Sequence, residues 1–233
     1  MQVTATKALI FDFDGLMIDT ETPEYQSWLE IYQEHNCELP LAKWCETIGT
    51  SHGTFDHYAY LETQLGRALE RLSMRDKRRA RFAELMNAQS LLLGVEDYIC
   101  QARQRGLKLG LASSSPYSWI SRHLEPLGLL QAFDTIKSAD DVERGKPDPA
   151  LYLAAVQTLG VAPTEAIALE DSPNGVLAAK RAGLFCVAVP NAITRELSFD
   201  LADLQVASLA ELPLEQLLSL KDNPSCHLEP GLL

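Results

Sequence analysis

The residues whose types could do chemistry stand at the ends of short apolar runs or in the loops that follow them. They are the carboxylates Asp12, Asp14, Glu170 and Asp171, the hydroxyls Ser113, Ser114 and Ser115, and Lys146. Carboxylates that lie close together repel one another, and such an arrangement is stable only with a cation among them. Hard oxygen ligands select magnesium over zinc. Magnesium with a lysine, hydroxyls and backbone N–H groups makes a phosphate site.

The elements that must position these groups are the strands of a parallel sheet. Buried strands are predicted at 7–13, 107–112, 133–138, 166–170 and 184–190, with a weaker sixth at 204–208. Helices are predicted between them, at 94–106, 149–160 and 172–183. This alternation predicts an α/β fold, a Rossmann-like parallel sheet with helices on both faces. Ligands of such sheets bind beyond the carboxyl ends of the strands, so the polar groups should meet at one edge.

One segment, about residues 20–88, breaks the alternation because it is helical throughout. It predicts a small all-helical cap domain inserted after the first strand. Within it, Thr22 before Pro23 predicts one helix start, and Ser73 with Asp76 three residues later predicts another. The expected organisation is an α/β core of 1–19 and 89–220, a cap of 20–88, and a loosely ordered tail of 221–233.

Four motifs in this order resemble those of the haloacid dehalogenase superfamily. They are DFDGLMIDT from Asp12, LASSS ending at Ser115, GKPDP around Lys146, and ALEDSPNG around Glu170. The resemblance covers roughly residues 6–215. The motifs are similar to those of the β-phosphoglucomutase and sugar-phosphate phosphatase group, in which a helical cap follows the first motif.

The resemblance implies a role for each motif residue. Asp12 is expected to be the nucleophile, and Asp14 the acid/base. Magnesium is expected on Asp12, the backbone carbonyl of Asp14 and Asp171, with Glu170 binding it through water. The phosphoryl oxygens are expected to be bound by Ser113, Lys146 and the backbone N–H groups of Gly15 or Ser114.

The cap is expected to choose the substrate, and Glu24, His52 and Lys77 are the cap residues that could reach it. Lys77 belongs to a basic run at 67–81, whose simplest interpretation is a solvated helix face. The sharper alternative is that Arg75 or Lys77 faces the cleft and holds an anionic part of the substrate.

Three other titratable residues are interpreted as structural. Asp19 lies where the chain leaves the core, which favours a hinge or helix-capping role. His35 and His57 are expected at the surface.

The function favoured by these residues is a magnesium-dependent phosphatase that hydrolyses a small phosphate monoester, a sugar phosphate, through an aspartyl-phosphate intermediate. The rival enzyme is a β-phosphoglucomutase-type mutase. Such mutases carry a histidine and an arginine where Glu24 and His52 stand here, which weakens that alternative. A non-catalytic phosphate-ester-binding module would have lost the nucleophile or the metal ligands, and all of them are present.

The composition of the chain argues against some classes of binding partner. The 233 residues hold 20 Lys and Arg against 32 Asp and Glu, a formal net charge of −12, which repels nucleic acid. We find no apolar stretch long enough to cross a membrane and no signal peptide, and the five cysteines are scattered. We expect a cytoplasmic enzyme whose partner is a small phosphorylated metabolite, without nucleic-acid or membrane binding. Oligomeric state stays open, with a monomer as the default.

Overall fold

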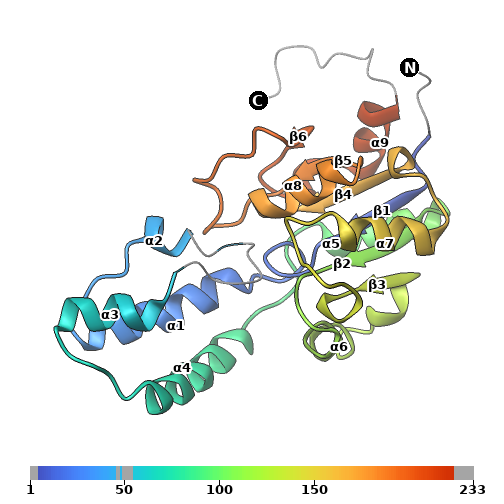
Figure 1. The fold of residues 1–233 in the computed structure, drawn as a ribbon. Coiled ribbons are helices and arrows are strands. Elements are labelled where there is room, and N and C mark those ends of the chain that lie inside the picture. Colours follow the sequence, from blue (N-terminus) through green and yellow to red (C-terminus); the bar gives the residue numbers. More distant parts are fainter. Residues whose placement is uncertain (1–4, 46–47, 49–54, 223–233) are drawn as a thin grey trace.

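A parallel six-stranded sheet forms the centre of the computed structural model, which describes residues 5–45, 48 and 55–222 (Figure 1). Its strand order is β3-β2-β1-β4-β5-β6, and every neighbouring pair is parallel. The strands are β1 (Ala8–Phe11), β2 (Lys108–Ala112), β3 (Thr135–Lys137), β4 (Ala166–Glu170), β5 (Phe185–Ala188) and β6 (Leu204–Gln205). The predicted α/β fold is confirmed.

Helices cover both faces of this sheet. Leu9 and Phe11 of β1 face one apolar cluster, which includes α5 (Val95–Gln104), α6 (Tyr117–Leu124) and α9 (Leu214–Asp222). Ala8 and Ile10 face the other, built with α7 (Ala150–Leu159) and α8 (Pro173–Arg181). Because successive side chains of a strand point to opposite faces, a strand buried on both faces must be apolar throughout. Short 3-10 helices lie at Leu130–Ala132, Ala139–Asp141, Pro163–Glu165 and Leu209–Glu211.

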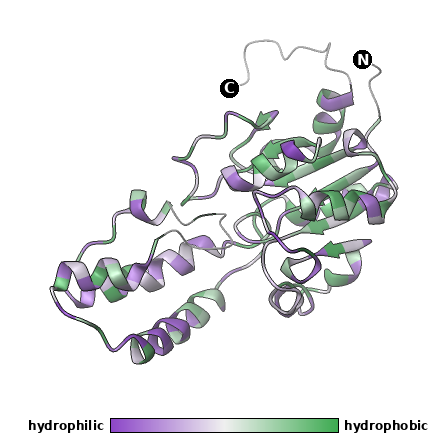
Figure 2. Ribbon diagram, in the orientation of Figure 1, coloured by the Kyte–Doolittle hydropathy of each residue, from purple (hydrophilic) through white to green (hydrophobic). Residues whose placement is uncertain are grey.

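Four helices follow β1 and form a separate block. They are α1 (Glu21–Glu34), α2 (Leu41–Cys45), α3 (His57–Leu65) and α4 (Arg71–Met86). The block lies beside the sheet, and its helices have outward polar faces (Figures 1 and 2). Its apolar side chains, among them Trp28, Tyr32, Trp44 and Leu61, form a cluster apart from the two that flank the sheet. The expected domain boundaries, 1–19 with 89–220 and 20–88, stay a prediction.

The chain enters and leaves this block through two adjacent segments. Ile18 forms an antiparallel bridge with Leu91, and the N–H of Leu92 donates to the carbonyl of Met17 at 2.9 Å. The carboxylate of Asp19 accepts from the N–H of Thr22 at 2.9 Å. Asp19 therefore caps the start of α1, as the sequence indicated.

Two predicted helix starts lie elsewhere. α1 begins at Glu21, so Pro23 falls within its first turn, where proline is tolerated. α4 begins at Arg71, two residues before the predicted cap Ser73. The reason is a tertiary contact, because the Glu62 carboxylate accepts from the N–H of Leu69 at 3.0 Å and pairs with the Arg71 guanidinium.

The C-terminal tail was predicted to begin at residue 221, but the last helix extends beyond that residue. α9 runs to Asp222, whose carboxylate accepts from the backbone N–H of Thr6 at 3.0 Å and from its hydroxyl at 2.8 Å. Residues 221 and 222 thus belong to the core, and 223–233 lie outside the described residues. Across the described part of the chain, none of the helices combines the length and the apolar character that crossing a membrane requires.

The apolar cluster of the helical block should contribute strongly to stability. Leu61 is fully buried there, whereas Leu72 on α4 is 69% exposed. We predict that Leu61→Ala lowers the free energy of unfolding by about 2–5 kcal/mol, because it leaves a cavity. The matched variant Leu72→Ala should change it by less than about 0.5 kcal/mol. Urea titration measures both, and equal losses would contradict the described packing.

Candidate active site

The carboxyl ends of β1 and β4 bring acidic side chains together. Phe11 pairs with Leu169, so the residues that follow, Asp12 and Glu170, lie side by side at the sheet edge. Asp12, Glu170 and Asp171 are all buried, and one carboxylate oxygen of each lies within 4.8 Å of the others. Three buried carboxylates at this distance repel strongly unless cations balance them.

Lys146 supplies one of these cations. Its Nζ lies 2.5 Å from Oδ1 of Asp12 and 2.6 Å from Oε1 of Glu170, and the side chain is 5% exposed. The hydroxyl of Tyr152 donates to the same Glu170 oxygen. Burial alone would favour a neutral amine, but the charges of Asp12 and Glu170 outweigh it and raise the pKa of Lys146. The ammonium therefore stays charged between the two strands.

One ammonium does not balance three carboxylates. Burial raises the pKa of Asp12 to about 7, with Lys146 opposing the shift and Glu170 adding to it. Burial, together with the charges of Asp12 and Glu170, raises the pKa of Asp171 well above its ordinary value. A divalent cation would relieve this repulsion, and the donors are all hard oxygens.

Gly15 keeps space free beside these carboxylates. Its φ is +78°, and a Cβ at this position would collide with the carboxylate of Asp171. Its N–H donates to the carbonyl of Ile18 at 2.9 Å, so the structure does not support its expected role as a phosphate donor. The residues present fit a small cation, and glycine at position 15 lets the loop approach it closely.

Asn191 orients Asp171, a role that the sequence did not indicate. Its Nδ2 donates to Oδ2 of Asp171 at 2.7 Å. Its Oδ1 accepts from the backbone N–H groups of Ile193, at 2.9 Å, and Thr194, at 3.0 Å. Asn191 lies in the loop after β5, about 20 residues from its partner, so sequence spacing carried no signal for this contact.

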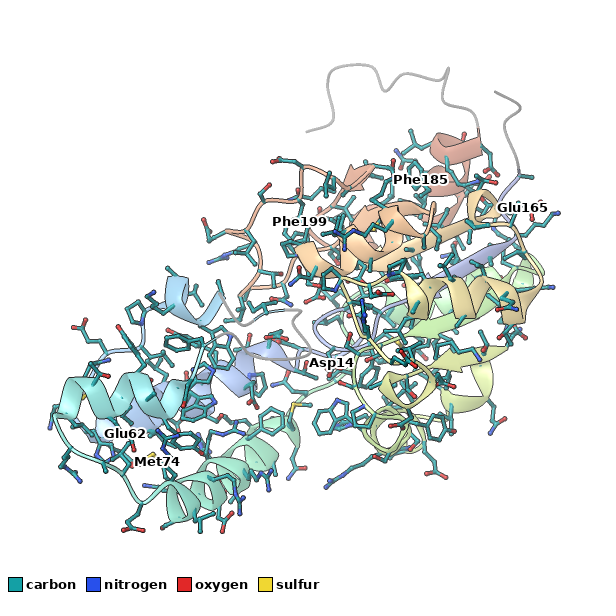
Figure 3. All side chains as sticks on the ribbon, in the orientation of Figure 1. Asp14, Glu62, Met74, Glu165, Phe185 and Phe199 are labelled. Atoms are coloured by element: carbon teal, nitrogen blue, oxygen red, sulfur yellow. The ribbon has the colours of Figure 1, made fainter. Side chains whose placement is uncertain are left out.

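Asp14 lies in the loop after β1, at the junction between the sheet and the helical block (Figure 3). Its Oδ2 accepts from the hydroxyl of Ser115 at 2.6 Å and from that of Ser113 at 3.4 Å. Its Oδ1 accepts from the indole N–H of Trp119 at 2.8 Å. The sequence pointed to the serines as phosphate ligands but gave no sign of Trp119, one turn into the following helix.

The serines after β2 line the same site. Ser113 is 1% exposed, and its hydroxyl accepts from the N–H of Ser115 at 3.0 Å. The Ser114 hydroxyl accepts from the N–H of Lys146 at 3.1 Å, which ties two motif loops together. Both serines, Lys146, Asp12 and Asp171 line one cavity of about 470 Å³. The structure thus brings together the predicted core residues, from four separate loops.

The helical block closes the other side of this cavity. Thr20, Glu21, Glu24, Trp44, Ile48, His57 and Phe82 line it from that side. Burial, together with the charge of Asp14, raises the pKa of Glu21 to about 8. His57 was expected at the surface, but it lies between the rings of Trp28 and Trp44, at 4.7 and 5.0 Å. Burial, helped by the charge of Arg78, lowers the pKa of His57 to about 4, so its ring is neutral.

The three cap residues that were expected to contact the substrate have different outcomes. Glu24 lines the cavity, and its carboxylate pairs with Arg78 at 2.7 Å. Lys77 is 62% exposed and pairs with Glu34 at 2.6 Å, away from the cavity lining. His52 lies outside the described residues.

Arg78, rather than Arg75 or Lys77, is thus the residue of the basic run that pairs with a side chain lining the cavity, Glu24. Arg75 pairs with its neighbour Asp76. Arg78 is 14% exposed and lies 5.1 Å from the ring of Trp28. Adjacent residues of a helix point about 100° apart, so the sequence could not decide between Lys77 and Arg78 without the position of α1.

Comparison with known proteins agrees with this geometry. A family model described as haloacid dehalogenase-like hydrolase matches residues 9–189. The YhcW protein of Bacillus subtilis, to which a phosphatase activity is ascribed, is 51% identical over 212 residues, 91% of this chain and 96% of that protein. Hexitol phosphatase B of Escherichia coli K12 is 32% identical over 219 residues, 91% and 96% of the two chains.

Two further similarities bear on the function. A β-phosphoglucomutase of Bacillus subtilis is 29% identical over 196 residues, 78% of this chain and 83% of that enzyme. The crystal structure of CbbY from Rhodobacter sphaeroides in complex with phosphate superimposes with a TM-score of 0.69 at 28% identity, over 88% of this chain and 96% of that one. The resemblance carried by the four motifs is confirmed: the chain belongs to the haloacid dehalogenase-like hydrolase family, and as an enzyme it is a phosphoric monoester hydrolase.

Proposed function

We propose that this hydrolase is a magnesium-dependent phosphatase that acts on the monoester of a small sugar or polyol through an aspartyl-phosphate intermediate. The observation that carries the proposal is the arrangement at the cavity floor. Asp12 lies 2.5 Å from Lys146 and beside Asp171, and Asp14 lines the same cavity. A nucleophile, a phosphate-binding cation and an acid/base group are thus within reach of one ester.

The residues divide the reaction into two steps. A carboxylate oxygen of Asp12 attacks phosphorus, and the bond from phosphorus to the alcohol oxygen breaks. Asp14 gives its proton to that oxygen as the alcohol leaves. Water then attacks the phosphorus of the aspartyl phosphate, Asp14 takes a proton from the water, and inorganic phosphate and free Asp12 result.

The other residues of the floor stabilise charge on the phosphoryl group. Lys146 and the hydroxyls of Ser113 and Ser114 are among the donors that line the cavity. Asp12, Asp171 and the backbone carbonyl of Asp14 would hold magnesium. When bound, this ion neutralises part of the negative charge that the phosphoryl oxygens carry. Glu170 keeps Lys146 in place and would contact the ion through water.

The substrate class follows from the cavity and the relatives. A cavity of about 470 Å³ is the size expected for a metabolite rather than a macromolecule. Polar groups and aromatic rings line it on the cap side, which suits a polyhydroxylated leaving group. A relative that is 32% identical is a hexitol phosphatase, which supports a sugar or polyol phosphate.

A mutase would need a free cation on the cap side to hold a second phosphate. In the described part of α4, Arg78 is paired with Glu24 and Lys77 with Glu34. Glu21 and Glu24 both face the cavity, and their carboxyl groups would not favour a second phosphate there. These contacts support hydrolysis over mutase chemistry.

The proposal predicts release of inorganic phosphate from sugar and polyol phosphates in the presence of magnesium. EDTA should abolish the release, and added magnesium should restore it. A panel that includes sorbitol 6-phosphate, glucose 6-phosphate and β-glucose 1-phosphate measures this. Conversion of β-glucose 1-phosphate to glucose 6-phosphate without phosphate release would favour the mutase. Absence of turnover of every ester by folded protein would sink the proposal.

The proposed role of Asp12 as the nucleophile can be tested by replacing its carboxylate with an amide. Asp12→Asn should lower kcat by at least about a thousandfold, because an amide does not attack phosphorus. The melting temperature should not fall, because the change removes one of three crowded carboxylates. Asp97→Asn, at an exposed position of α5, serves as the matched control and should keep full activity. Substantial turnover by Asp12→Asn would show that another group attacks.

Magnesium binding should weaken as pH falls. The cation requires ionised carboxylates, and without it the pKa of Asp12 is about 7. Protons therefore compete with the cation below this pH, and apparent affinity should be lower at pH 6 than at pH 8. Isothermal titration of the protein with magnesium chloride at both values measures it. Equal affinity at the two pH values would contradict the shared-carboxylate site.

Glu24 should affect substrate binding rather than the chemical step. Its carboxylate, held by Arg78, can accept hydrogen bonds from hydroxyls of the leaving group. Glu24→Gln should raise KM for the preferred sugar phosphate about tenfold with little change in kcat, which corresponds to one lost charge-assisted hydrogen bond. Lys77→Gln is the control and should leave both constants unchanged. A large fall in kcat alone would place Glu24 in the chemistry instead.

A further inference from the structure

The carboxylate of Asp14 has a fixed hydrogen-bond donor on each oxygen. The indole N–H of Trp119 donates to Oδ1 at 2.8 Å, and the hydroxyl of Ser115 donates to Oδ2 at 2.6 Å. Both donors come from the segment after β2, whereas Asp14 itself follows β1. A carboxylate bound on both oxygens cannot rotate freely about its Cβ–Cγ bond.

The indole is in turn held between two rings. Phe82 of α4 lies nearly parallel to it, with ring centroids 5.8 Å apart and planes at 21°. The ring of His123 lies 4.1 Å away on α6, and its Nδ1 is 2.8 Å from the carbonyl of Trp119. Trp119 therefore connects Asp14, at the sheet edge, with a helix of the block on the other side of the cavity.

We propose that Trp119 is a positioning residue that holds Asp14 for proton transfer, and that its stacking on Phe82 makes this position depend on where α4 lies. The inference rests on the proposed function, in which Asp14 is the acid/base. Asp14, Ser115, Trp119 and Phe82 all line the active-site cavity. The position of α4 relative to the sheet and the orientation of the Asp14 carboxylate are therefore coupled.

The physical reason is geometric. A general acid works only within hydrogen-bond reach of the atom it protonates, and a misplacement of about 1 Å can cost a hundredfold in rate. The N–H of Trp119 orients Asp14 through a hydrogen bond, whereas the ring of Trp119 packs against Phe82. Trp119→Phe separates the two, since it keeps a ring against Phe82 and removes the donor.

Comparing esters with different leaving groups distinguishes loss of proton transfer from a general loss of structure. The alcohol of a sugar phosphate must be protonated as it leaves, whereas p-nitrophenolate leaves as a stable anion. The value of kcat/KM reports the steps through departure of the leaving group, so it senses the acid and not the later hydrolysis of aspartyl phosphate. The ratio of kcat/KM for an alkyl phosphate to that for p-nitrophenyl phosphate therefore measures how well Asp14 is placed.

The experiment compares Trp119→Phe with wild type on sorbitol 6-phosphate, glucose 6-phosphate and p-nitrophenyl phosphate. We expect kcat/KM to fall about tenfold for the alkyl esters and less than about twofold for p-nitrophenyl phosphate, a fraction of the full contribution of a general acid. Tyr117→Phe, which removes a hydroxyl from an exposed position on the same helix, is the control and should change neither value. Equal losses on both classes of ester, or no loss on either, would overturn the inference.

Further variants test the contact of Ser115 with Asp14 and the contact of Phe82 with Trp119. Ser115→Ala should lower the same ratio, and Ser115→Thr, which keeps the hydroxyl, should restore it. Phe82→Leu should lower the ratio in wild type but add less than about twofold in the Trp119→Phe background, because it acts through the indole N–H. Full additivity of these two changes would refute the link to α4. If wild type cleaves none of these esters, the proposed function itself fails, which is seen before any variant is compared.

Discussion

The structure depends on one electrostatic constraint, the burial of three carboxylates around a single ammonium. Asp12, Glu170 and Asp171 lie buried at the ends of β1 and β4, where burial weakens the screening of their repulsion by solvent, and Lys146 bridges two of them. Burial raises the pKa of Asp12 to about 7, with Lys146 opposing the shift and the charge of Glu170 adding to it. Such a cluster is costly to fold, and a bound cation offsets part of that cost. In the proposed function, these carboxylates hold a cation, and the cation and Lys146 together bind the phosphoryl group.

The fold serves this constraint by bringing distant loops to one edge. Parallel strands place the residues after β1, β2 and β4 side by side, and α8 approaches closely enough that a side chain at Gly175 would collide with Glu170. The helical block then closes the cavity from the other side, with Glu24 and His57 among its lining residues. In the proposed reaction, the floor binds the phosphoryl group and the opposite wall binds the leaving group.

The sequence predicted the floor of the site well and the opposite wall poorly, for a physical reason. Asp12 and Asp171 directly follow buried strands, and parallel strands end at the same edge of the sheet; Lys146 lies in the loop after β3, which was predicted to reach that edge. Trp119 and Asn191 act through side chains that reach across the fold, and no periodicity marks such contacts. The wall depends on how helices face one another. Arg78 rather than Lys77 contacts Glu24, a residue that lines the cavity, because α4 presents that side to α1. His57 is only partly exposed because the rings of two tryptophans from other helices pack against it.

The central claim is that Asp12 attacks phosphorus and carries the phosphoryl group between the two steps. It is tested most directly by mixing the enzyme with magnesium and its best ester, quenching in acid within milliseconds, and mapping the protein by mass spectrometry. The account predicts a peptide from the β1 loop that carries one phosphoryl group, located on Asp12 and absent when the quench follows complete turnover. A phosphoryl group on any other residue, or turnover without any phosphorylated peptide at any quench time, would contradict it.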